Sequence, residues 1–268
     1  MKVKKEDRVK IVEPRVFLLG ETTLNHEGLE AYLEYVGAPE WKSDAPSDAE
    51  ELTEVMGRIC YRSFAPGLNP NVTKVREGNS DYIQNIVNVK HGSVLEHANV
   101  NFVFAGVSRV FTHELVRHRA GTAMSQESLR YVRLTELGFW VPTVIRETPE
   151  AMTIMTNVVG LLEDVQKNLA EVANIAEKKS FTEKKKLTSA FRRVAPLGLA
   201  TSIGWSANLR ALRHCLEMRT APEAEEEIRL VFGKVGEIAK KRYPNVFADY
   251  EIEVVDGHPW YKTANRKV

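Results

Sequence analysis

Arginine replaces lysine throughout two long stretches of this sequence, and that bias is its strongest chemical signal. Lysine is absent between His91 and Gln166 and again between Leu187 and Gly233. Arginine presents a rigid planar fork that binds phosphate and carboxylate through paired hydrogen bonds, whereas lysine is a flexible point charge. The pattern indicates bound anions near some of the following residues: Arg109, Arg117, Arg119, Arg130, Arg133, Arg146, Arg192, Arg193, Arg210, Arg213, Arg219 and Arg229.

The triplet Arg117-His118-Arg119 is the strongest single candidate site. Like charges repel at such close spacing unless an anion or a carboxylate faces them. In the alternative interpretation, individual arginines form internal or intersubunit ion pairs with carboxylates such as Glu114 and Glu127. That alternative explains a lone arginine well and the triplet less well.

Common cofactor, metal and nucleophile motifs are absent. The sequence has neither GxGxxG after a strand nor GxxxxGK[ST]. The pairs His91/His97 and His113/His118 are six and five residues apart, so neither shares a helix face as i,i+4 metal ligands do, and no metal site is predicted. Ser128 lacks the GxSxG elbow of a nucleophilic serine.

The two cysteines are predicted to be packed thiols. Cys60 falls on an apolar helical stripe, and Cys215 lies close to Leu212 and Leu216. Two cysteines without CxxC spacing are too few for a disulfide framework, which favours a reducing compartment.

The composition is that of a globular protein without a charge bias. The 268 residues include 37 Lys+Arg and 36 Asp+Glu, for a net charge of +1, and 43% are hydrophobic. This balance does not attract a nucleic-acid backbone or an anionic membrane. The apolar run near the N-terminus is far shorter than the ~20 residues of a membrane span. We therefore expect a cytoplasmic protein with no nucleic-acid and no membrane partner.

Hydrophobic periodicity predicts the elements that position these residues. Residues 9–20 and the alternating Val100, Phe102 and Phe104 predict strands, and residues 196–206 predict a buried strand or turn. Helices are predicted from a capping box at Ser47, over 80–89, and from Ser108 into Arg117–Arg119, where 121–128 breaks the helix. A long helix is predicted from Thr148-Pro149 to about 172, and its expected buried side consists of Ile154, Met155, Val158, Leu162, Val165, Leu169 and Val172. Further helices are predicted over 182–194, over 209–219, and from about Pro222, where Thr220 to Glu223 forms a capping box.

No repeat or linker divides the chain, and the residues from Tyr243 onward show little periodicity. We therefore expect one α+β domain over residues 1–268, with a mixed or antiparallel sheet flanked by long helices.

The run from Arg117 to Tyr131, RHRAGTAMSQESLRY, resembles the defining motif of flavin-dependent thymidylate synthases, an RHR triplet followed by a spacer and S-x-R-Y. Three other segments agree in order: Lys90 to His97, Arg192 with Pro196, and Asn208 to Arg229. The resemblance covers about residues 52–250.

The resemblance implies methylation of dUMP to dTMP. In that family methylenetetrahydrofolate supplies the carbon, FAD carries hydride and NADPH is the reductant, with no cysteine nucleophile. This fits a chain in which neither cysteine follows a proline, as the classical enzyme's nucleophile does. The resemblance also implies a homotetramer with active sites shared between subunits.

Site residues follow from the resemblance position by position. Arg219 is the expected catalytic group, stabilising negative charge on the uracil ring, and His91 is expected near the flavin and folate. The expected cofactor-binding residues are Ser93, Arg117, His118, Arg119, Gln126, Asn208, Leu209, Arg210 and His214. The expected substrate-binding residues are Glu114, Arg117, Gln126, Glu127, Ser128, Leu129, Arg130, Arg192 and Arg219.

Three positions depart from the family pattern. The spacer between RHR and serine has eight residues, Ala120 to Glu127, where seven are common, so we expect one residue to bulge. Gln126 replaces a usual glutamate and His214 a frequent asparagine. Glu223 replaces a frequent histidine, and we interpret it as part of the helix cap.

Two other function classes remain open from sequence. A non-catalytic flavin- or nucleotide-binding protein would keep the arginines but lose turnover through these departures. An RNA-binding module would use the segment Arg130-Tyr131-Val132-Arg133, which the near-neutral net charge disfavours.

Overall fold

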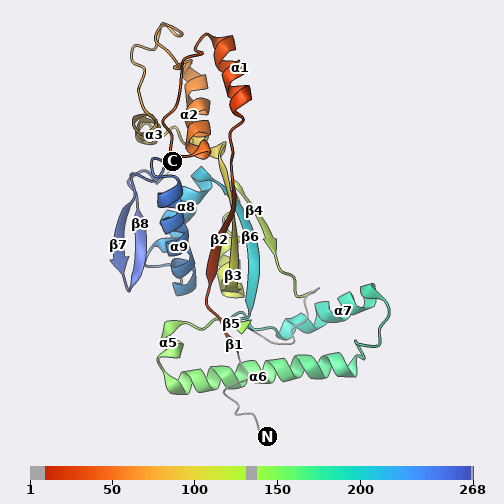
Figure 1. Cartoon of the computed structure of the whole chain (residues 1–268). Helices are drawn as coiled ribbons and strands as arrows, with labels where there is room; N and C mark the ends of the chain where they lie inside the picture. Colours follow the sequence, from red (N-terminus) through yellow and green to blue (C-terminus); the bar gives the residue numbers. More distant parts are fainter. Residues whose placement is uncertain (1–9, 131–137, 267) are drawn as a thin grey trace. The chain divides into compact units, whose positions relative to one another are not determined.

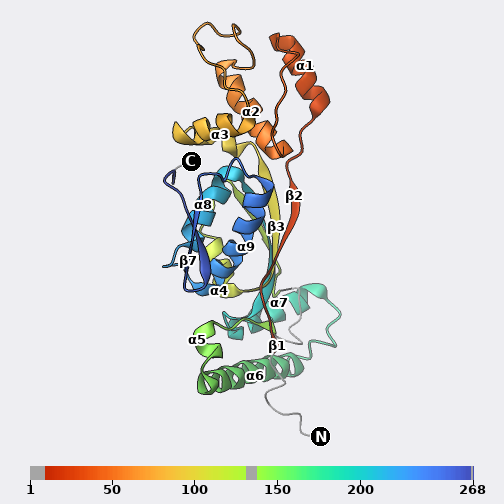
Figure 2. The same cartoon turned by 60° about the vertical axis from the view of Figure 1, so that its left-hand side comes forward.

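The computed structural model describes residues 10–130, 138–266 and 268. They form two compact units, each assembled from separate stretches of the chain. The first unit contains the described residues up to Arg15 with Val103–Arg117 and Met124–Gly204, and the second contains Val16–Phe102, His118–Ala123 and Trp205–Val268. Figure 1 and Figure 2 show the elements of both units. That both units form one domain stays a prediction.

The largest sheet has four strands in the order β2-β3-β6-β4. Val100, Phe102 and Phe104 of β3 are buried, which confirms the strand predicted from their two-residue period. The formation of a strand at β4 was not predicted, because the sequence there signals only the end of a helix. The strand bounds are β2 Arg15–Glu21, β3 Asn99–Ser108, β6 Ala200–Asn208 and β4 Thr122–Gln126.

Two smaller sheets complete the strand pairing among the described residues. Strand β1 (Lys10–Ile11) pairs in parallel with β5 (Gly138–Phe139), and β7 (Glu251–Val255) pairs antiparallel with β8 (His258–Lys262). Parallel and antiparallel pairs therefore coexist with helices, which confirms a mixed α+β fold. The β7–β8 hairpin lies in the tail that showed no periodicity.

The second unit packs helices around buried aromatic rings. Trp205 of β6 stacks on Phe102 of β3, with ring centroids 6.3 Å apart, and meets Phe232 of α9 edge to face at 5.7 Å. Helix α8 packs on α9, and both contact β8. The helices of this unit are α1 His26–Val36, α2 Asp48–Tyr61, α3 Asn79–Asn88, the 3-10 helix η2 Gly92–Glu96, α8 Leu209–Thr220 and α9 Glu226–Arg242.

The first unit buries Phe139, Val141 and Val159 in a smaller core. Pro149 is the first residue of the long helix α6, as predicted, and the predicted buried face of α6 is confirmed only in part. Met155 packs against this core, and Leu162, Val165 and Leu169 are half-buried. Ile154, Val158 and Val172 are 65%, 47% and 84% exposed. The helices of this unit are α4 Arg109–Leu115, α5 Thr143–Arg146, α6 Pro149–Val172, α7 Phe181–Phe191 and the 3-10 helix η3 Arg192–Val194.

Three helix predictions need correction. Helix α1 was not predicted, although Leu29, Tyr32, Leu33 and Val36 recur at helical spacing and pack in one core. Helix α4 ends at Leu115 instead of running into Arg117–Arg119, because the chain beyond it forms β4. The final helix starts at Glu226, and its cap is Glu225, whose carboxylate accepts the Glu227 N–H at 2.8 Å.

The capping box from Thr220 to Glu223 does not form. The Thr220 hydroxyl donates to the carbonyl of Leu216 at 2.7 Å and accepts the Tyr261 N–H at 2.9 Å, so it is engaged at the end of α8. Glu223 is therefore not part of that cap. None of the helices in the described part of the chain combines the length and apolar character that a membrane crossing requires.

Candidate active site

A tight turn at Gly121 joins the histidine-arginine segment to the start of α8 in the second unit. Gly121 has φ +69°, and a Cβ there would lie 2.4 Å from the Asn208 amide nitrogen. The Asn208 N–H donates to the Gly121 carbonyl at 2.9 Å, and the Asn208 side chain caps α8 by accepting the Ala211 N–H at 2.8 Å. Only glycine fits this close approach without strain.

A pocket of about 510 Å³ opens beside this turn. The predicted cofactor residues Asn208, Arg210 and His214 line it, and Arg210 pairs with Glu96 across 2.6 Å. Sequence analysis did not assign Glu96 and Arg266 to the site, although both line the pocket. Glu96 lies in a segment that carries the resemblance, whereas no motif marked Arg266. The remaining lining residues are Ala120, Gly121, Ala211 and Val268.

His118 and Arg219 meet directly in the second unit. The Arg219 Nε–H donates to His118 Nε2 at 2.6 Å, and the His214 ring meets the His118 ring edge to face at 5.6 Å. Burial, followed by the charges of Arg219 and His214, lowers the pKa of His118 to about 4. The fold thus joins the expected catalytic arginine to a neutral histidine of the RHR triplet.

His91 and Ser93 lie at the 3-10 helix η2. The half-buried His91 ring meets Tyr61 edge to face at 6.0 Å, and its buried Nδ1 has no hydrogen-bond partner among the described residues. Ser93 and Arg119 are exposed. Leu209 is fully buried, and its N–H donates to the Ala98 carbonyl at 2.9 Å, so its side chain belongs to the core.

The remaining predicted substrate residues lie in the first unit. Glu114 is half-buried on α4, and Arg117 follows the helix with its Nε–H donating to the His113 carbonyl at 3.3 Å. The Gln126 amide donates to the Thr112 hydroxyl at 3.3 Å. Arg192 begins η3 and is exposed.

Residues 127–130 are tied to neighbouring elements of the first unit. The Glu127 N–H donates to the Ser202 carbonyl at 2.9 Å, and the Glu127 carboxylate accepts the Ser202 N–H at 3.2 Å. The Arg130 N–H donates to the Ser128 hydroxyl at 3.3 Å, and Leu129 between them is half-buried. The expected Tyr131 of the motif, with Val132 and Arg133 of the RNA-binding alternative, lies outside the described residues.

Arg109 is a candidate that the residue-by-residue reasoning did not assign to the site. Its Nε and one Nη are buried without a hydrogen-bond partner among the described residues. Burial lowers the pKa of Arg109, the Glu127 carboxylate opposes that shift, and the charge of Arg192 adds to it. Like charges repel, and a bound anion would relieve the repulsion between the two guanidinium groups. The sequence pointed to Arg109 only as one of the arginines in the stretches that lack lysine.

The cysteines differ from each other. Cys60 is exposed, so its prediction as a packed thiol is wrong, because its position on α2 faces solvent. Cys215 is buried as predicted, and burial raises the pKa of its thiol to about 12. Cys215 is therefore protonated and a poor nucleophile at neutral pH.

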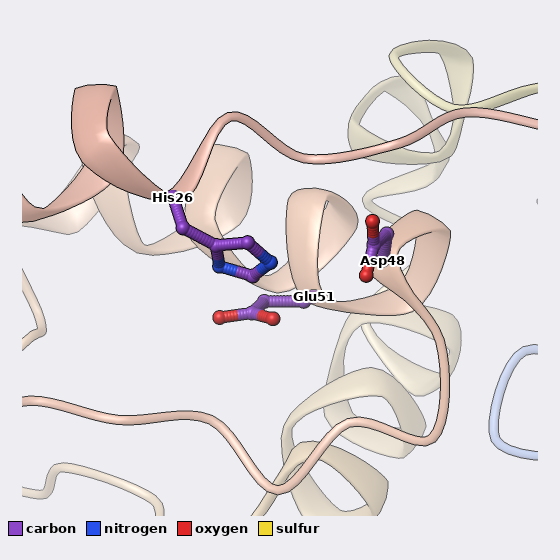
Figure 3. Close-up of side chains that lie close together, drawn as sticks. All are labelled: His26, Asp48 and Glu51. Atoms are coloured by element: carbon purple, nitrogen blue, oxygen red, sulfur yellow. The ribbon is translucent and has the colours of Figure 1, made fainter.

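Three groups with metal-ligating atoms also gather where α1 and α2 begin. One ligand atom from each of His26, Asp48 and Glu51 lies within 4.8 Å of the others (Figure 3). Asp48 accepts the Leu24 N–H at 2.9 Å, and both carboxylates lie in the first turn of α2, where negative charge is favourable. The hydrogen bond from Leu24 to Asp48 and the favourable position of negative charge at the start of α2 give structural roles to the two carboxylates of this cluster.

Comparison with known proteins identifies the family. Residues 43–245 match the family model described as thymidylate synthase complementing protein. A flavin-dependent thymidylate synthase of Mycolicibacterium vanbaalenii is 35% identical over 223 residues, covering 80% of this chain and 84% of that protein. The enzyme of the same name from Corynebacterium glutamicum is 35% identical over 224 residues, covering 81% and 85%.

The fold is also similar to a solved structure. A UMP/dUMP methylase, PolB from Streptomyces cacaoi, crystallised with 5-Br UMP, aligns with a TM-score of 0.59 and 16% identity, covering 89% of this chain and 94% of that one. The fold of this chain is thus similar to that of the methylase. The chain belongs to the flavin-dependent thymidylate synthase family.

Proposed function

We propose that this protein is an enzyme that converts dUMP to dTMP, with methylenetetrahydrofolate as carbon donor, FAD as hydride carrier and NADPH as reductant. The observation that carries the proposal is the family match over residues 43–245, which includes the RHR segment and Arg219. Within the matched residues, His118 accepts a hydrogen bond from the guanidinium of Arg219. The pocket lined by His214 adjoins this pair and has the volume to hold a cofactor.

The pocket beside Gly121 suits the FAD of this family. The missing Cβ at Gly121 leaves room for the Asn208 amide, which provides polar groups at the pocket, and the guanidinium of Arg210 provides positive charge. These are the features that a pyrophosphate-bearing dinucleotide requires. Arg119 is exposed and available to the same cofactor. FAD, when bound, would accept hydride from NADPH and deliver it to the one-carbon unit.

The first unit supplies the groups proposed to hold dUMP. Arg109 and Arg192 interact electrostatically, and the Glu127 carboxylate opposes the lowering of the Arg109 pKa. A nucleotide phosphate carries about two negative charges at neutral pH and would compensate both. Ser128 and Arg130 belong to the same unit and would complete the phosphate and sugar contacts.

Arg219 is proposed as the catalytic residue. Its guanidinium, held at Nε by His118, would face the uracil edge and stabilise negative charge on N3 and the adjacent carbonyl as C5 becomes nucleophilic. No cysteine is needed for that activation, in keeping with the protonated buried thiol of Cys215. His91, with an unpartnered Nδ1, is proposed to orient the folate.

The exposed apolar stripe of α6 supports the proposed homotetramer. Ile154, Val158 and Leu161 recur at helical spacing and are 65%, 47% and 62% exposed. Large apolar side chains in a row on one helix face are typical of an interface. A second copy of the chain is the occupant proposed for this face, and a cytoplasmic location stays part of the proposal.

One anaerobic experiment tests the reaction. The flavin of the purified protein is reduced with NADPH, dUMP and methylenetetrahydrofolate are added, and dTMP is measured together with reoxidation of the flavin. Formation of dTMP, retained in a Cys60→Ser/Cys215→Ala double variant, is the expected result. Reduced flavin without dTMP, although dUMP is bound, would instead indicate a non-catalytic nucleotide-binding protein.

A further inference from the structure

The guanidinium of Arg219 donates a hydrogen bond to an imidazole. Its Nε–H meets His118 Nε2 at 2.6 Å. A guanidinium has donors only and keeps its proton at every pH that proteins tolerate, so the histidine nitrogen must be the acceptor. The His118 ring is therefore neutral, and its single proton is on Nδ1.

The surroundings of His118 preserve this neutral form. The ring is largely buried, and Arg219 and His214 both place positive charge against it. The His214 ring lies edge to face with it, at an interplanar angle of 66°. Cys215 of α8 also senses the charge of Arg219, and its buried thiol is protonated and contributes no charge. The imidazole consequently remains an acceptor throughout the neutral pH range.

The backbone of His118 is fixed as well. The Thr122 hydroxyl donates to the His118 carbonyl at 2.7 Å, and Gly121, between them, accepts the N–H of Asn208 at 2.9 Å. Asn208 caps the first turn of α8, whereas Arg219 belongs to its last turn. The segment that carries His118 is thus attached to the start of α8 by its backbone and to the end of α8 by its side chain.

We propose that His118 is a positioning residue for Arg219, because its neutral Nε2 fixes the plane in which the guanidinium faces the uracil ring. This inference rests on the catalytic role of Arg219 proposed above. A guanidinium is planar and rigid, so a hydrogen bond at Nε sets the directions of both terminal nitrogens. His118 thus acts on the substrate through Arg219, in addition to any contact it makes with the flavin.

The test compares His118→Leu, which removes the acceptor, with His118→Gln, whose Oε1 replaces Nε2 as acceptor. Loss of positioning by about 1 Å lowers turnover on the order of 100-fold. We expect that loss in kcat for dTMP formation in His118→Leu, with the FAD content and the rate of flavin reduction by NADPH retained. His118→Gln should recover most of the lost kcat, and the control His258→Leu, in the β7–β8 hairpin, should match wild type.

Two further measurements separate positioning from structure. If His118 acts through Arg219, then His118→Leu added to Arg219→Lys should lower kcat no further than Arg219→Lys alone. In ¹⁵N NMR spectra, the Arg219 Nε–H signal, assigned by its loss in Arg219→Lys, should be protected from solvent exchange in wild type and His118→Gln but not in His118→Leu.

The outcomes distinguish this inference from the proposed function. Wild-type kcat in His118→Leu, additive effects in the double variant, or loss of FAD as the sole defect would each overturn positioning while leaving the reaction intact. Absence of dTMP formation by wild type would refute the proposed function, and with it the role of positioning in catalysis. An unprotected Arg219 Nε–H in the wild-type protein would refute the contact itself.

Discussion

Replacing Glu50 with glutamine should remove a pH dependence of folding stability. The Glu50 side chain is completely buried at the first turn of α2, where its Oε1 accepts the N–H groups of Asn245 and Val246 at 2.8 and 2.9 Å. Burial raises its pKa to about 7, from 4.5, against the lowering effect of these hydrogen bonds and that from Ser47. Glu50 is therefore largely protonated in the folded protein below pH 7.

The sign and size of the effect follow from proton linkage. Between pH 4.5 and 7 the folded state binds more protons at Glu50 than the unfolded state, so the free energy of unfolding falls as pH rises through this window. At 1.36 kcal/mol per pKa unit, a shift of this size corresponds to a loss of about 3 kcal/mol by pH 8. Glutamine resembles the protonated acid and retains an acceptor for both N–H groups, so Glu50→Gln should escape the loss.

The assay is urea unfolding of apoprotein at one protein concentration, at pH 5 and pH 8, for wild type, Glu50→Gln and the control Glu34→Gln, an exposed residue of α1. Relative to wild type, Glu50→Gln should gain about 2 kcal/mol between the two pH values, and Glu34→Gln should gain nothing. Other titratable groups, including His118, change the free energy of unfolding equally in wild type and in the variants, so their effects cancel in the difference. A constant difference between Glu50→Gln and wild type would refute the reasoning.

Three other changes have defined outcomes. Gly121→Ala places a Cβ 2.4 Å from the Asn208 amide nitrogen at a residue with positive φ, so the amount of bound FAD should fall at least tenfold. The measurement is flavin absorbance per chain, and a full complement of flavin would contradict the assignment of this pocket to FAD. Val158→Lys on the exposed stripe of α6 should reduce the mass found by light scattering, and an unchanged mass would exclude that face as the interface. Arg213→Met removes the two hydrogen bonds of 2.7 and 2.9 Å to the Asp249 carboxylate and should lower the free energy of unfolding in guanidinium by about 3 kcal/mol. A decrease of less than about 1 kcal/mol would show that water solvates Asp249 in the variant.

The sequence predicted elements well where local signals agree with tertiary contacts. The Ser47 hydroxyl accepts the Glu50 N–H as the capping box required, and the alternation in β3 coincides with buried side chains. Prediction from the sequence failed where a contact with a residue far away in the chain determines the local structure. Thr220 has the sequence of a cap, yet Tyr261 of the hairpin engages its hydroxyl, and no local pattern announces that contact.

The same distinction applies to the site. The absence of lysine singled out the arginines and the RHR triplet, and the resemblance to the family assigned Arg219 and Asn208 to the site. The contact between His118 and Arg219 was not foreseeable, since 101 residues separate them in the chain. Likewise, only the folded chain shows Arg266 in the pocket with Arg210.

The His118–Arg219 contact suggests why a histidine suits the centre of the RHR triplet. A carboxylate there would pair with Arg219 more strongly, but it would neutralise the positive charge that Arg219 must offer to a uracil ring. A lysine or arginine would repel Arg219 and accept no hydrogen bond. A neutral imidazole orients the guanidinium and leaves its full charge for the substrate. Burial and the adjoining His214 oppose protonation of that imidazole, so the fold protects the one form that performs both tasks.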